Sequence, residues 1–70
     1  MIKLTNATPE HAGNPLYINP EWISSVFEAA KQPGGSLTTF VFGGPIGNVW
    51  EVEESPSKVV QLIETWKKMQ

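Results

Sequence analysis

The sequence predicts a small α+β domain: an antiparallel β-sheet of four to five strands, a meander or a partly closed barrel, with one C-terminal α-helix. Three stretches carry this prediction. Residues 37–42 are all aromatic, β-branched or aliphatic, residues 49–54 alternate apolar and polar side chains, and residues 56–68 carry apolar side chains at helical spacing. With 70 residues, the chain is expected to form a single domain over residues 1–70.

The first part of the chain predicts two short strands joined by a long loop. Residues 1–5 alternate, with Ile2 and Leu4 on one face, which indicates a strand. The polar residues 6–14 contain a proline and a glycine and form a loop that is long for a hairpin connection. Residues 15–18 form the second strand, whose leading proline suits a strand start or a sheet edge.

Residues 22–30 follow a turn signal at Asn19–Pro20 and fit two alternatives. They could form a helix, because four apolar side chains recur at helical spacing: Ile23, Val26, Phe27 and Ala30. They could also form a strand that contains a β-bulge, because Ile23, Val26 and Phe27 favour strands. Propensity alone favours the helix. A turn at residues 31–36 then leads into the central hairpin.

The central hairpin joins strands 37–42 and 49–54 through the glycine-rich turn 43–48. Two registers are open, since a slip of one residue moves every side chain to the other face. We favour the register that pairs Phe42 with Val49. It places Leu37, Val41, Trp50 and Val52 on one face, and Phe40, Phe42, Val49, Glu51 and Glu53 on the other.

The second of these faces is a candidate protein interface, made by Phe40, Phe42 and Val49 with the glutamates as a polar rim. One helix can cover only one face of the sheet. The phenylalanines on the other face must therefore be covered by another strand, by the long loop or by a partner chain.

A serine N-cap at Ser55, followed by Pro56, begins the C-terminal helix. Its apolar stripe faces the sheet, and its lysines near the C-terminal end suit the helix dipole. The stripe consists of Val59, Leu62, Ile63, Trp66 and Met69.

Composition excludes several classes of protein. The chain has no cysteine and one histidine, so disulfides and cysteine or histidine metal sites are excluded, and no cofactor is expected. A 70-residue chain has a small core, so association is the available means of stabilisation. We expect a homo-oligomer, with a dimer the commonest form. Alternatively, the aromatic residues, which include Trp22, Trp50 and Trp66, could form a dense core by themselves.

The net charge is −2 and the five basic residues are all lysines, which argues against nucleic-acid binding. The N-terminal residues lack the apolar core of a signal peptide, and no run approaches the roughly 20 apolar residues of a membrane span. We therefore expect a cytoplasmic protein.

Four groups of side chains invite a catalytic or ligand-binding interpretation, and a structural one is preferred for each. Glu51, Glu53 and Glu54 fit a solvated strand that leads into a helix. His11 with Ser24 or Ser25 lacks an orienting acid and an oxyanion motif. The glycines of residues 43–47 lack the lysine of a phosphate loop. The aromatic set Phe40, Phe42 and Trp50 lacks the surrounding cations of a base-stacking platform.

One further pattern combines several of these stretches: Met1 to Thr5, Tyr17 to Pro20, Ile23, Glu54–Ser55, and Val59 with Ile63. In these residues and in their order, the chain resembles FlbD-type flagellar and swarming-motility proteins and similar small phage and prophage proteins. It implies that residues 22–30 form a strand, and it implies no catalytic residue. The longer first loop and the turn 43–48 depart from the family pattern, and both lie in connections.

We therefore expect a non-enzymatic protein-interaction module, of the kind found among phage, prophage or motility accessory proteins. The alternative is a small β-barrel regulator that binds nucleic acid.

Overall fold

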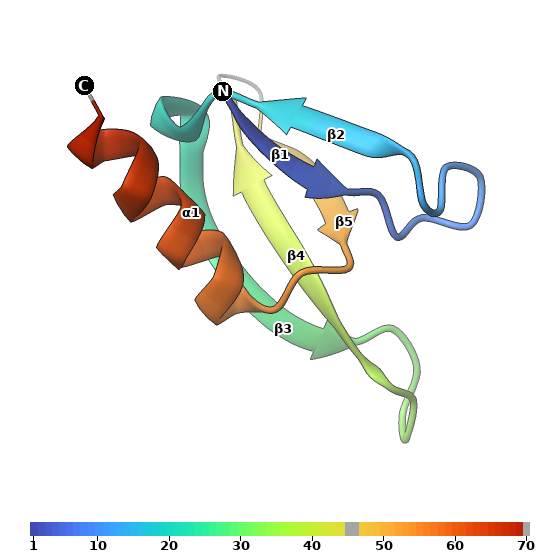
Figure 1. Cartoon of the computed structure of the whole chain (residues 1–70). Helices are drawn as coiled ribbons and strands as arrows, with labels where there is room; N and C mark the ends of the chain where they lie inside the picture. The colour runs from blue at the N-terminus through green and yellow to red at the C-terminus, as the bar shows by residue number, and fades with distance from the viewer. Residues whose placement is uncertain (45–46, 70) are drawn as a thin grey trace.

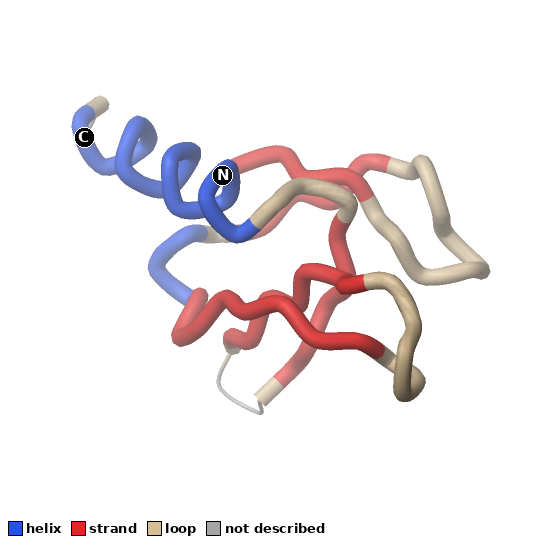
Figure 2. Tube along the Cα trace, turned by 90° about the horizontal axis from the view of Figure 1, so that it is seen from below, coloured by secondary structure: helices blue, strands red, loops and turns tan. Residues whose placement is uncertain are grey.

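The computed structural model describes residues 1–44 and 47–69, and over these the chain forms two antiparallel sheets and one α-helix (Figure 1). Strands β1 and β2 make one sheet, and β3, β4 and β5 make the other in that order. The helix and the connections that follow β1 and β3 lie at opposite sides of the strands (Figure 2). The elements are β1 (Ile2–Thr5), β2 (Pro15–Ile18), the 3-10 turn η1 (Pro20–Trp22), β3 (Ile23–Ala30), β4 (Leu37–Gly43), β5 (Asn48–Val52) and α1 (Pro56–Lys68).

The described strands form two sheets and close no barrel, so the single sheet of four to five strands expected from the sequence is not confirmed. The two sheets meet at one corner, between the end of β1 and the end of β5. Away from that corner β1 and β5 do not pair. The corner consists of an Asn6–Val52 bridge and two hydrogen bonds, from Ala7 N–H to the Glu51 carbonyl (3.0 Å) and from Glu53 N–H to the Thr5 carbonyl (2.9 Å).

The segment whose state the sequence left open is the strand β3, which pairs with β4 along its whole length. The register shifts between Ile23 and Ser25, so one extra residue of β3 is accommodated in a β-bulge. After the bulge, Val26 lies opposite Val41 on the core face, and Phe27 faces the other way.

Strands β4 and β5 pair in the register favoured from the sequence, with Phe42 opposite Val49. Val41 and Val52 are buried on the face that points to the core. Leu37, expected on the same face, is 64% exposed. The β3–β4 hairpin extends beyond the helix and beyond β1 (Figure 1), so nothing described covers its far end.

The core between the two sheets and the helix is aliphatic. It contains no fully buried aromatic side chain, although the structure describes all three tryptophans, all three phenylalanines and the tyrosine. The alternative of a core made by aromatic residues is therefore wrong. The buried apolar side chains are Ile2, Leu4, Ile18, Val41, Val52 and Val59.

Helix α1 begins where the sequence indicates, because Ser55 Oγ accepts the Lys58 N–H at 3.2 Å. Val59 is buried against the strands, and α1 contacts both β3 and β1. Met69, expected at the end of the apolar stripe, is 76% exposed because it follows the last helical residue, Lys68. The half-buried part of the stripe is Leu62, Ile63 and Trp66.

A carboxylate joins β1 to the start of the helix. Thr5 donates two hydrogen bonds to Glu54, from its backbone N–H to Oε1 and from its Oγ1 to Oε2, both at 2.9 Å. Both residues are half-buried, so water competes only in part for these bonds. Strand β5 ends at Val52, so Glu53 does not extend it as expected, and its side chain is exposed.

Glu54→Ala should lower the free energy of unfolding by about 1.5–3 kcal/mol, because hydrogen bonds to charged groups contribute about that much when partly shielded. Urea denaturation followed by circular dichroism measures this change. The matched control is Glu53→Ala, which removes an exposed carboxylate one residue away and should change stability by less than about 0.5 kcal/mol. Equal effects of the two substitutions would contradict the assignment.

Candidate protein-interaction surface

The register of the three-stranded sheet gathers apolar side chains on the face that points away from the core. Phe40 and Phe42 lie on β4, two residues apart, and Val49 of β5 lies opposite Phe42. All three candidate interface residues from the sequence therefore share one face. Phe40 and Phe42 are half-buried, whereas Val49 is 51% exposed.

Phe27, which sequence reasoning did not assign to this surface, lies at its centre. It is opposite Phe40 on β3, and its ring stacks on both neighbours, with centroids 5.5 Å from Phe40 and 5.5 Å from Phe42. Such offset stacking adds to the burial of apolar area. The adjacent pair Val26–Phe27 could have revealed it, since neighbours in a strand face opposite ways.

Phe40 and Phe42 are thus shielded in part by the Phe27 ring of the same sheet. Phe27 itself remains 39% exposed. Together Phe27, Phe40, Phe42 and Val49 form what we call the phenylalanine face. Helix α1 lies on the opposite side of the sheet, where Val26 packs against the core.

An ion pair borders the phenylalanine face. Lys31 Nζ lies 2.8 Å from Glu51 Oε2, and Glu51 is the cross-strand neighbour of Phe40. The Glu51 side chain is only 17% exposed, so the pair shields one edge of the face from water. Of the two glutamates expected as a rim, Glu51 has this role and Glu53 lies outside the strand.

The other groups considered from the sequence remain apart. His11 lies in the exposed connection between β1 and β2, Ser24 Oγ donates to the Phe42 carbonyl at 3.3 Å, and Ser25 lies opposite Phe42.

Within the described ranges, no three histidine, cysteine or acidic side chains cluster in a way that could hold a metal ion. The turn 43–47 has Gly44 and Gly47 at positive φ, and its residues 45 and 46 lie outside the described part.

The lysines are spread over the molecule. Lys3 is on β1, Lys31 is in the ion pair, and the remaining three lie on α1. Phe40 and Phe42 share a face, whereas Trp50 points to the opposite side of the sheet. The three aromatic residues of the supposed base-stacking platform are therefore not brought together.

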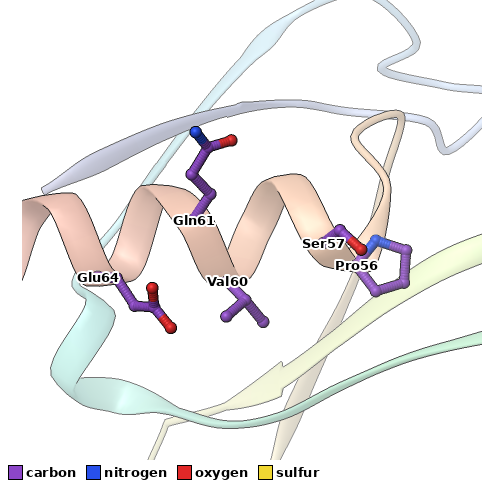
Figure 3. A pocket seen from close by; sticks show the side chains of 5 residues that line it. All are labelled: Pro56, Ser57, Val60, Gln61 and Glu64. Carbon is purple, nitrogen blue, oxygen red and sulfur yellow. The ribbon is translucent and has the colours of Figure 1, made fainter.

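A shallow depression of about 390 Å³ lies on the exposed side of α1 (Figure 3). Its lining comes from this one helix, and Gln61 points away from the helix on a different side from Val60 and Glu64. With walls from a single element, it cannot enclose a ligand.

The chain matches no protein-family model, and no curated protein or solved structure shows significant similarity to it. The resemblance to FlbD-type proteins stays a prediction from the sequence. None of the helices in the part of the chain that the structure covers is both long enough and apolar enough to cross a membrane.

We predict no appreciable nucleic-acid binding at physiological salt, because a net charge of −2 with scattered lysines offers no cationic track for phosphates. A mobility-shift titration with single- and double-stranded oligonucleotides measures it. Micromolar binding that weakens as salt is raised would favour the nucleic-acid alternative.

Proposed function

We propose that this chain is a non-enzymatic protein-interaction module that acts through the phenylalanine face, and that its first partner is a second copy of itself. The resemblance described above suggests a cytoplasmic accessory protein, either of a phage or prophage or of bacterial motility. One observation carries the proposal: three stacked phenylalanines lie on a sheet face that no described helix or strand covers.

The position of these rings is energetically unfavourable for an isolated monomer. Phe27 leaves 39% of its surface in water and Val49 leaves 51%, while smaller aliphatic side chains fill the core. Burying apolar surface contributes about 25 cal/mol per Å². A contiguous apolar face with a charged border is typical of protein interfaces.

The overall dimensions support the same conclusion. The accessible surface is 4761 Å², against about 4,300 Å² expected for a compact monomer of 7.7 kDa. The radius of gyration is 12.0 Å, against about 11 Å expected for this length. The β3–β4 hairpin projects beyond the helix and beyond β1 (Figure 1), and its two strands carry Phe27 and Phe40.

The size of the face limits the affinity. Strands about 4.8 Å apart with a rise of about 3.3 Å per residue give this three-stranded face about 300 Å² in projection. A standard stable interface buries about 800 Å² per partner. We therefore propose a weak dimer that forms at micromolar or higher concentrations, unless sheet extension along an edge strand adds to it.

Val49→Glu and Phe27→Glu should each raise the dissociation constant of the dimer by about tenfold or more, because each places a charge in a desolvated contact, and tenfold corresponds to about 1.4 kcal/mol. Sedimentation equilibrium at several concentrations measures this change. The matched control is Leu37→Glu, since Leu37 is 64% exposed but belongs to the opposite face.

Circular dichroism should show that all three variants remain folded. A wild-type chain that stays strictly monomeric at several hundred micromolar would refute self-association. If Leu37→Glu weakened the dimer as much as Val49→Glu does, the interface would lie elsewhere.

A further inference from the structure

A small cavity lies at the end of β2, and it does not belong to the phenylalanine face. Its volume is about 170 Å³. Three of its walls are aromatic and come from β2, η1 and β5, which are separate in the sequence. The lining residues are Met1, Tyr17, Ile18, Asn19, Trp22 and Trp50.

The backbone under Trp22 is held in place although its side chain is 57% exposed. Trp22 N–H donates to the Asn19 carbonyl at 3.0 Å, and the Trp22 carbonyl accepts the Gly44 N–H at 2.8 Å. Asn19 Oδ1 also accepts the Glu21 N–H at 3.0 Å, which fixes the start of η1. A rigid backbone that presents a large aromatic ring to water is the usual arrangement of a binding anchor.

The position of Trp22 also depends on Gly43. A Cβ atom at Gly43 would clash with the Trp22 carbonyl oxygen, so only glycine permits this close approach of β4 to η1. The indole is thus placed at the cavity by the η1 turn and by the close approach of the end of β4.

The size and lining of the cavity define its occupant. A dry cavity of about 150 Å³ lined by apolar side chains is large enough to bind benzene. Here a slightly larger space is walled by Tyr17, Trp22 and Trp50, and aromatic rings pair favourably with one another. The space is therefore large enough for one six-membered aromatic ring.

The free edge of β2 runs beside the cavity. Thr5 points its N–H and C=O toward Glu54 and Glu53, away from its cross-strand partner Pro15. Thr5 and Pro15 are therefore a pair without mutual hydrogen bonds. Because such pairs alternate along an antiparallel ladder, Tyr17, two residues after Pro15, also points its N–H and C=O away from β1. Within residues 1–44 and 47–69, no strand pairs with that edge.

We propose that the cavity binds one aromatic side chain of an extended peptide segment, and that the peptide backbone pairs with Tyr17 at the edge of β2. Ring insertion supplies the specificity, and the two backbone hydrogen bonds orient the segment, as in other cases of strand addition. Pro15 has no N–H to donate, so the pairing is limited to one short stretch. The site is independent of the phenylalanine face, because Trp50 and Val49 point to opposite sides of β5.

The test is an NMR titration of the ¹⁵N-labelled chain with a blocked pentapeptide of threonines that has a central phenylalanine. The indole N–H signals of Trp22 and Trp50 and the backbone amide of Tyr17 should shift and saturate. The indole of Trp66, which lies on α1 outside the cavity, serves as the internal reference and should not move. The same peptide with a central alanine should bind at least tenfold more weakly.

Trp22→Ala should weaken binding of the phenylalanine peptide at least tenfold, whereas Leu37→Ala, at an exposed apolar side chain far along the hairpin, should leave it unchanged. The titration is repeated on Val49→Glu, so that loss of self-association cannot be mistaken for loss of this site.

Equal binding of the alanine peptide, or shifts of Trp66 as large as those of Trp22, would overturn the proposal. Absence of saturable shifts would also overturn it. Blocked phenylalanine amide, which offers the ring without the neighbouring residues, should bind more weakly than the pentapeptide, and equal affinity would refute pairing at the edge of β2.

Discussion

The corner where Thr5 meets Glu53 and Glu54 is the constraint on which the rest of this fold depends. The two sheets share no long ladder, and the backbone contacts there are supplemented by the Glu54 carboxylate, which accepts from both the N–H and the hydroxyl of Thr5. One residue after Glu54, Ser55 caps the helix. A single short segment therefore ends the second sheet, attaches the first and starts α1, so these three elements are positioned together.

This geometry explains why the core is aliphatic. Two short sheets that meet at a corner, with one helix across the open side, enclose a small core whose fully buried side chains, Leu4, Val41, Val52 and Val59, are all aliphatic. Since interiors are close-packed, small aliphatic side chains suit this small core better than large rings do. The aromatic residues are placed around the core: the phenylalanines on the outer sheet face, Tyr17, Trp22 and Trp50 around the cavity at the end of β2, and Trp66 on α1, half-buried against the core.

Much of the fold was predictable from local patterns, and the parts that were not depend on contacts between distant segments. The pairing of Phe42 with Val49 and the cap at Ser55 follow from alternation and from N-cap chemistry. The division into two sheets depends on how β1 leaves β5, which no local pattern encodes. In the candidate surface, Phe40, Phe42 and Val49 were identified, but Phe27 was missed because the helix and strand interpretations of residues 22–30 place it differently.

The β-bulge between Ile23 and Ser25 determines which face of the sheet each later residue of β3 points to. Each residue beyond it faces the side set by an odd or even count from that point. Had the ladder continued without the bulge, Val26 would lie opposite Phe40 and Phe27 opposite Thr39, so the ring would point into the core and the valine into water. The one extra residue between Ile23 and Ser25 thus decides whether Phe27 belongs to the phenylalanine face or to the core. In evolution, a single codon gained or lost there would move the side chains of each face of β3 to the other face without changing any of the other residues.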